Sequence, residues 1–219
     1  MKFDVILFDF DGVICDSVGH SNAVLAEGLT EKGFPTSTDD AIRAFAGRRW
    51  ADVLKMIETQ IGEEVDPQFI GQQYKQLSRR VVLAAQPIPG VESFLDMTAG
   101  FRRAVVASSE IFWVTRTLDR FGLAEHFGEH VYSAALLDRG KPDPQVYQLA
   151  IDKLQVDPKR CVAIEGTTVG VTAAVAAGIP TIGLTAASHI RADDGERMRA
   201  AGASYVAHDF DDVADWIDL

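Results

Sequence analysis

The chain has 219 residues, of which 47% are hydrophobic and 24% charged, a composition that is ordinary for a globular protein with a sizeable core. Its net charge of −11 argues against nucleic acid and anionic membrane surfaces as partners, and no apolar run approaches the roughly 20 residues that span a bilayer. The first residues lack the features of a signal peptide, so we expect a cytoplasmic protein in which Cys15 and Cys161 are free thiols.

The chain opens with a predicted buried strand over residues 2–8, which is rich in Val, Ile, Leu and Phe. The next segment, residues 17–85, holds no convincing strand and shows several helical patterns in succession. These expected helices cover residues 17–32, 38–46, 50–61 and 66–83. A stiff segment with Pro and Gly at residues 86–90 connects these helices to the rest of the chain, and such a segment suits a hinge. We therefore expect residues 17–85 to form an inserted helical cap domain.

The remainder of the chain alternates strand and helix patterns. Strands are expected at residues 103–107, 130–133, 161–164, 180–184 and 204–207, and helices at 110–121, 144–154, 169–177 and 192–201. Such alternation is typical of a parallel sheet with helices on both faces. The predicted fold class is α/β, with a doubly wound parallel sheet formed by residues 1–16 and 86–219 and the helical cap between them.

Two carboxylates, Asp9 and Asp11, follow the first strand. They would lie at the carboxyl end of a parallel strand, where open α/β sheets bind ligands. Carboxylates held close together repel, so they require a cation, a shared proton or separate environments, and a magnesium ion would let both stay ionised. One could then attack phosphorus while the other handles the proton. The alternative is that both are turn formers, because Asp-x-Asp-Gly is common where a chain reverses.

Polar residues also stand at the ends of later strands. Ser108 and Ser109 precede a helix, so each hydroxyl is either a helix cap or a phosphate ligand. Lys141, in a loop stiffened by glycine and proline, is either a solvated lysine or the point charge that a phosphate requires. Glu165 is either a carboxylate at a helix start or a site residue. Because these strand ends would meet at one edge of the sheet, their pattern favours a common site.

With these motifs the chain resembles the haloacid dehalogenase (HAD) superfamily, in the branch of helical-cap phosphatases and β-phosphoglucomutase-like proteins. Asp9-Phe-Asp-Gly-Val-Ile-Cys-Asp-Ser17 is similar to the first motif of that family and Ser108 to the second. Gly140-Lys-Pro-Asp-Pro is similar to the third motif and Glu165-Gly-Thr-Thr-Val-Gly170 to the fourth. The resemblance covers nearly all of the chain and implies a Rossmann-like core.

The resemblance also implies a role for each matched residue. Asp9 would be the nucleophile that forms an aspartyl-phosphate, and Asp11 the general acid and base. Asp9, the main-chain carbonyl of Asp11 and Glu165 would bind Mg²⁺. The transferring phosphoryl group would be bound by Lys141, by Ser108 and by the adjacent Ser109. The implied activity is that of a magnesium-dependent phosphoric monoester hydrolase acting on a small phosphate ester, with a sugar phosphate as the expected class.

Two departures from the family pattern keep other functions open. The fourth motif usually has a second acid where this chain has Gly166, so Mg²⁺ binding would weaken. One alternative is therefore a catalytically impaired protein that binds a phosphate ligand or has a regulatory role. β-Phosphoglucomutase-like members carry a histidine where this chain has Ser21, and His20 stands one residue early, about 100° away around a helix. A phosphomutase is the second alternative, and that displacement disfavours it.

Within the expected cap, residues 47–50 form the expected specificity loop. Arg48 and Arg49 would contact an anionic or polar group of the substrate. Trp50 would contact either a sugar face or the protein core. The sequence does not indicate the oligomeric state.

Overall fold

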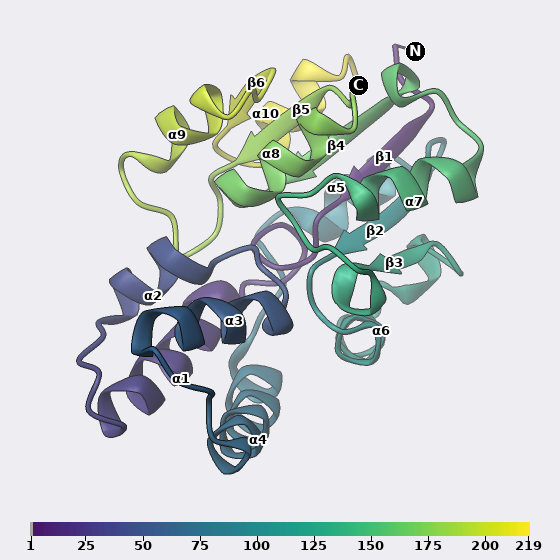
Figure 1. Cartoon of the computed structure of the whole chain (residues 1–219). Helices are drawn as coiled ribbons and strands as arrows, with labels where there is room; N and C mark the ends of the chain where they lie inside the picture. Colours follow the sequence, from purple (N-terminus) through teal and green to yellow (C-terminus); the bar gives the residue numbers. More distant parts are fainter. Residues whose placement is uncertain (1) are drawn as a thin grey trace.

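The computed structural model describes residues 2–219, apart from the side chains at positions 78 and 79. Residues 2–219 contain one six-stranded sheet, in which all neighbouring strands are parallel and the order is β3-β2-β1-β4-β5-β6 (Figure 1). The strands are β1 (Val5–Phe8), β2 (Arg102–Ala107), β3 (Val131–Ser133), β4 (Cys161–Glu165), β5 (Thr181–Leu184) and β6 (Tyr205–Ala207). The strand order reverses next to β1, which confirms the doubly wound prediction.

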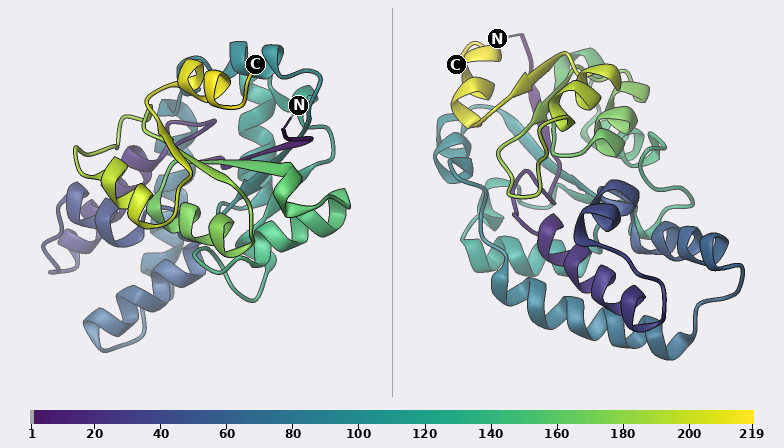
Figure 2. Two further views of the ribbon diagram at one scale, coloured as in Figure 1. Left: turned by 90° about the horizontal axis from the view of Figure 1, so that it is seen from above. Right: turned by 90° about the vertical axis from the view of Figure 1, so that its left-hand side faces the viewer.

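Helices cover both faces of this sheet (Figure 2). They are α5 (Val91–Met97), α6 (Ile111–Phe121), α7 (Gln145–Leu154), α8 (Thr168–Ala176), α9 (Asp194–Ala200) and α10 (Phe210–Trp216). Side chains of β1 alternate between the faces: Ile6 and Phe8 pack with α5, α6 and α10, whereas Val5 and Leu7 pack with α7 and α8. Burial on both sides explains the continuous apolar run of β1. No helix described within residues 2–219 combines the length and the apolarity that crossing a membrane requires.

Residues 18–84, all described in their backbone, form four helices without a strand, and we call this segment the helical insertion. The helices are α1 (Val18–Glu31), α2 (Thr38–Phe45), α3 (Trp50–Ile61) and α4 (Pro67–Ala84). They share a hydrophobic core of their own, to which Leu25, Phe45, Ile57 and Phe69 belong. Each helix begins and ends within one residue of its predicted range. Figure 1 shows the insertion beyond the edge of the sheet where β1 ends.

Local signals explain the agreement at the helix ends. The Ser37 side chain accepts a hydrogen bond from the main chain of Asp40, whose carboxylate accepts one in return, so that a capping box begins α2. Asp66 caps α4 directly before Pro67, which occupies the first helical position. α3 ends at Gly62, whose φ of 78° is left-handed.

Two helices, α5 and α10, lie outside the predicted ones. Each is seven residues long, too short for a clear apolar period. Their aromatic residues Phe94 and Phe210 lie with ring centroids 5.0 Å apart in the core, so a tertiary contact rather than a local signal holds these helices in place. Cys15 and Cys161 are buried free thiols, as predicted.

The register of the central strands brings the strand ends together. Phe8 of β1 pairs with Val105 on one side and with Ile164 on the other. Asp9, directly after β1, donates its main-chain N–H to the carbonyl of Ile164 at 2.9 Å. Glu165, the last residue of β4, therefore stands at the same edge as Asp9.

Candidate active site

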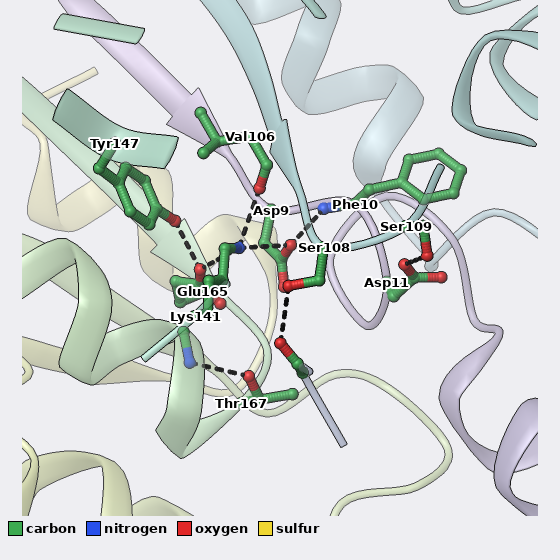
Figure 3. Close-up of polar contacts among 12 residues, drawn as sticks. Asp9, Phe10, Asp11, Val106, Ser108, Ser109, Lys141, Tyr147, Glu165 and Thr167 are labelled. Atoms are coloured by element: carbon green, nitrogen blue, oxygen red, sulfur yellow. Dashed lines mark hydrogen bonds and ion pairs between the residues drawn. The ribbon is translucent and has the colours of Figure 1, made fainter. Parts of the chain in front are cut away.

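Three charged side chains meet in the interior at this edge of the sheet. Lys141 Nζ lies 2.9 Å from Asp9 Oδ1 and 2.7 Å from Glu165 Oε1 (Figure 3). It donates a third hydrogen bond, of 2.9 Å, to the main-chain carbonyl of Val106. All three side chains are at most 4% exposed. Asp9 Oδ1 also accepts a hydrogen bond of 2.8 Å from the N–H of Phe10. The structure thus brings together three of the residues that the sequence predicted for the site.

This cluster holds two carboxylates and one ammonium group, and burial makes such an imbalance unfavourable. Burial opposes the charge of Lys141, but the charges of Asp9 and Glu165 outweigh it and raise the pKa of Lys141. Burial, together with the charge of Asp9, raises the pKa of Glu165 to about 8, although Lys141 acts in the opposite direction. The second negative charge of the cluster is therefore uncompensated, and a bound cation would allow Glu165 to ionise.

Tyr147 completes the cluster from α7. Its hydroxyl donates a hydrogen bond to Glu165 Oε1, the same oxygen that Lys141 contacts. The Tyr147 side chain is fully buried, and burial raises the pKa of its hydroxyl, so the group remains a donor. Sequence reasoning missed this residue, because a tyrosine on the apolar face of a helix looks like any core aromatic.

The Asp11 carboxylate lies apart from the cluster. Its two oxygens accept hydrogen bonds from the hydroxyls of Ser17 and Ser109. Figure 3 shows the contact with Ser109. Burial raises the pKa of Asp11, against the opposing effect of the two hydroxyls. A carboxyl group with a raised pKa holds its proton more readily, which is what a general acid requires. Ser17 was not predicted as a site residue, although it stands in the first motif.

Ser108 and Thr167 contact the helical insertion. Ser108 Oγ donates a hydrogen bond of 2.7 Å to the carbonyl of Gly47, in the loop between α2 and α3. A β-carbon at Gly47 would lie 2.4 Å from Thr167 Oγ1, and the φ of 79° is left-handed, so this position requires glycine. Thr167 itself caps α8 through a hydrogen bond from Gly170. The insertion therefore contacts the edge of the sheet at which the charged cluster lies.

The two arginines of the predicted specificity loop have different environments. Arg49 is 7% exposed, and its five N–H groups make five hydrogen bonds. Two go to the Asp52 carboxylate and three to main-chain carbonyls of the sheet domain, those of Ala134, Leu137 and Asp138. Arg49 thus joins the insertion to the loop before Lys141, which differs from its expected contact with substrate. Arg48 donates only its Nε–H to a described residue, within the insertion, and lines the cavity.

A cavity of about 960 Å³ lies between the helical insertion and the edge of the sheet. Asp9, Asp11, Ser108 and Ser109 line it, so the predicted nucleophile and the predicted general acid face the same space. Trp50 also lines this cavity.

The donor set at this edge fits a weakly held magnesium ion. Within residues 2–219, no three Asp, Glu, His or Cys side chains gather closely enough to hold a metal. The Asp11 carboxylate is hydrogen-bonded to two serines, and Lys141 and Tyr147 both contact Glu165 Oε1. Glu165 Oε2 is buried without a hydrogen-bond partner among the described residues, so it remains available as a metal donor together with the carboxylate of Asp9 and main-chain oxygens. Magnesium is usually bound by one or two carboxylates completed by waters and a substrate phosphate, so this donor set fits it.

The space around Gly166 explains the absence of a second acid. A β-carbon at Gly166 would lie 2.7 Å from the main-chain oxygen of Gly12. His189, 4% exposed, packs against the same turn, since a β-carbon on Gly12 would meet its Cε1 at 2.9 Å. A carboxylate side chain could therefore enter position 166 only if the backbone moved.

Comparison with known proteins decides the family. A family model described as haloacid dehalogenase-like hydrolase matches residues 6–184. The chain belongs to this family. The putative phosphatase YhcW of Bacillus subtilis is 31% identical over 182 residues, which cover 81% of each chain. Such relatives place this haloacid dehalogenase-like hydrolase among the phosphoric monoester hydrolases.

Solved structures of this family share the whole architecture. The haloacid dehalogenase-like protein ATU0790 of Agrobacterium tumefaciens has a TM-score of 0.84 and 31% identity, covering 99% of this chain and 98% of that one. A HAD family hydrolase of Deinococcus radiodurans, solved with bound phosphate and sodium, has a TM-score of 0.76 and 29% identity, covering 99% and 96%. The helical insertion and the sheet are thus both features of HAD-like hydrolases.

Proposed function

We propose that the protein is a magnesium-dependent phosphatase that hydrolyses a small-molecule phosphate ester through an aspartyl-phosphate on Asp9. The observation that carries this proposal is the buried contact between Lys141 and Asp9 beside a cavity large enough for a ligand. Among described residues, the hydrogen bonds to the Asp9 carboxylate end on Oδ1, which leaves Oδ2 to attack phosphorus. Similarity to phosphatases supports the same reaction. A sugar phosphate is the ester class expected from the sequence.

Asp9 and Asp11 can carry both halves of the reaction. In the first, an Asp9 oxygen bonds to phosphorus as the bond from phosphorus to the ester oxygen breaks, and Asp11 gives its proton to the leaving alcohol. In the second, Asp11 takes a proton from water, the water oxygen bonds to phosphorus, and the bond to Asp9 breaks. The sum is ester plus water giving alcohol plus phosphate, with both aspartates restored.

Lys141 and Ser108 would support the transferring group in different ways. All three N–H groups of Lys141 are engaged, so it acts by its charge on the phosphoryl oxygens rather than by a further hydrogen bond. Ser108 would exchange its bond to the Gly47 carbonyl for one to the phosphoryl group. Asp9, the main-chain carbonyl of Asp11 and Glu165, whose Oε2 has no described partner, would hold Mg²⁺. When bound, the ion supplies positive charge to the phosphoryl oxygens and to the carboxylates.

The structure bears on both alternative functions, a phosphomutase and a non-catalytic binding protein. His20 is exposed and lies outside the described lining of the active-site cavity, whereas Ser21 belongs to that lining. This placement disfavours a phosphomutase, which would need the histidine beside the substrate. The absence of a second acid at Gly166 keeps a non-catalytic binding protein as the alternative that an activity measurement must exclude.

We also propose that residues 1–16 and 86–219 act as the catalytic core and residues 17–85 as a cap. The separate hydrophobic core of the insertion supports this division. The cap would open to admit substrate, with residues 86–90 as the hinge. A cytoplasmic location and the absence of nucleic-acid and membrane partners stay predictions from composition.

The experiment measures phosphate release from a panel of phosphate esters, with and without Mg²⁺, for the wild type and Asp9→Asn. We expect turnover that requires Mg²⁺ and disappears in Asp9→Asn. Asp152→Asn, which alters an exposed carboxylate on α7, is the matched control and should keep full activity. Activity that survives Asp9→Asn would contradict the assigned nucleophile. Ligand binding without turnover of any ester would favour the binding protein.

A further inference from the structure

The cavity beside Asp9 indicates what kind of alcohol the phosphate is attached to. We propose that the substrate is a phosphate monoester whose alcohol carries a bulky apolar group, rather than a simple sugar. This inference rests on the phosphatase function proposed above and narrows its substrate class. The observations behind it are the size of the cavity, the residues that line it, and the hydrogen bonds that its polar side chains already make.

The cavity is larger than a small phosphate ester requires. Its volume of about 960 Å³ lies at the upper end of the roughly 300–1,000 Å³ of pockets that hold drug-sized ligands. The phosphoryl group would occupy only the part lined by Asp9, Asp11 and Ser108. The remaining space lies against the helical insertion and α6, and it is available to the alcohol.

Apolar side chains from both parts of the molecule line that space. They include Leu25, Trp50, Leu54 and Leu77 from the insertion and Phe112 and Trp113 from α6. Phe112 is 70% exposed, and its neighbour Ile111 is 44% exposed. Large apolar side chains left exposed at the edge of a cavity are typical of a ligand-binding surface. An apolar alcohol would cover them and release the water that they order.

The polar side chains of the lining are largely engaged with the protein itself. Ser21 Oγ and Asn22 Nδ2 both donate to the carbonyl of Val18, at 3.1 and 2.9 Å. A sugar hydroxyl placed against these two side chains would lose its water without gaining a partner, and an unpaired buried hydroxyl is unfavourable.

The arginines of the lining differ in how many of their donors are already engaged. Arg120 donates to the carbonyl of Ala85, and the Arg116 guanidinium lies 5.6 Å from the centroid of the Phe112 ring. Among the described residues, Arg48 and Arg116 keep donors, which could bind the phosphate or a polar group of the substrate. The lining thus recognises an apolar body with the phosphate at one end.

The test compares phosphate esters of primary alcohols, because their leaving groups are chemically alike and differ in size and polarity. The series is ethyl, butyl, hexyl and 2-phenylethyl phosphate, with glucose 6-phosphate and fructose 1-phosphate as polar members. We expect kcat/KM to rise about fourfold for each methylene buried, which corresponds to the transfer free energy of that group. 2-Phenylethyl phosphate should exceed both sugar phosphates at least tenfold.

A variant at the cavity edge makes the test specific. Phe112→Ser should flatten the rise of kcat/KM along the alkyl series, because it removes exposed apolar surface from the lining without disturbing the core. Leu136→Ser is the matched control: Leu136 is 86% exposed and does not belong to the described lining, so the series should remain steep.

The outcomes separate this inference from the function on which it rests. Equal kcat/KM for ethyl and hexyl phosphate, or a preference for the sugar phosphates, would overturn the apolar substrate class while leaving the phosphatase intact. No phosphate release above the Asp9→Asn blank from any ester would overturn the phosphatase itself. A rise along the series that Phe112→Ser flattens and Leu136→Ser does not would support the inference.

Discussion

The guanidinium of Arg49, carried by the helical insertion, donates a hydrogen bond of 2.6 Å to the main-chain carbonyl of Asp138 in the loop that leads to Lys141. The Arg49 stem also packs against this loop, since a β-carbon at Gly140 would lie 2.8 Å from Arg49 Cγ. One buried side chain thus connects the position of the insertion with the position of Lys141.

Arg49→Met should therefore weaken the contact between the insertion and the sheet domain. The substitution keeps an apolar stem but leaves the Asp52 carboxylate and three carbonyls without their donor, and we expect a loss of about 3 kcal/mol in the free energy of unfolding. The rate constant kcat should fall as the Lys141 loop loosens. Arg43→Met removes an exposed ion pair with Asp193 across the same boundary, and such pairs contribute little. Equal effects in the two variants would contradict the role given to Arg49.

Tyr147→Phe tests the buried hydrogen bond to Glu165. The change removes one hydroxyl from a fully buried position while Lys141 still contacts the same oxygen, so we expect a loss of about 1.5 kcal/mol in unfolding free energy. Tyr132→Phe, which removes a partly buried hydroxyl near His130, should change stability by less. Urea unfolding of the two variants gives the comparison. A Tyr147→Phe protein as stable as the wild type would show that this hydrogen bond does not stabilise the cluster.

The part of the site that could be predicted lies at the ends of neighbouring strands. Asp9, Lys141 and Glu165 were found because parallel strands end at one edge of a sheet, so polar residues at those ends converge whatever the rest of the chain does. Tyr147 was missed, because nothing in a helical pattern distinguishes a buried tyrosine with a polar partner from one without. The role of Arg49 was also beyond the sequence, since its partners at 134, 137 and 138 are carbonyls that any residue offers.

The same reasoning explains what could be predicted of the fold. Helices α2 and α4 were located closely because Ser37 and Asp66 carry their start signals locally. Helices α5 and α10 were not located, because the contact between Phe94 and Phe210 that buries them joins distant parts of the chain. Substrate preference depends on which residues of the insertion face the cavity, and the sequence carries no signal for that orientation.

Gly166→Ala tests whether position 166 has room for a side chain. Its β-carbon would lie 2.7 Å from the Gly12 main-chain oxygen, and a backbone atom cannot move away cheaply, so we expect the melting temperature to fall. Gly71→Ala is the matched control, because nothing lies within 4 Å of its β-carbon on α4 and alanine favours helix by about 1 kcal/mol. A Gly166→Ala protein with unchanged stability would show that the backbone of the turn at Gly12 can move at little cost. An acidic side chain could then be accommodated at position 166.

The last prediction concerns the dependence of stability on pH. Burial lowers the pKa of His189 below its ordinary value of 6.5, although the Gly166 backbone, Asp16 and Asp194 act in the opposite direction. Well above pH 6.5 the imidazole is neutral in both the folded and the unfolded state, so it does not contribute to the pH dependence of stability. As the pH falls below 6.5, the unfolded chain takes up a proton that the folded protein resists, so acidification favours unfolding.

His189→Gln should remove this loss of stability at low pH. The measurement is the free energy of unfolding of the wild type and of the variant at pH 7.5 and at pH 5.5, and the difference between the two proteins is compared at the two pH values. The carboxylates titrate in both proteins, so their contribution to the pH dependence cancels in this comparison. We expect the wild type to lose more stability than His189→Gln between the two values. His20→Gln, at an exposed position on α1, should keep the wild-type pH dependence. Parallel pH profiles for the wild type and His189→Gln would mean that the imidazole, despite its 4% exposure, is protonated as easily in the folded protein as in the unfolded chain.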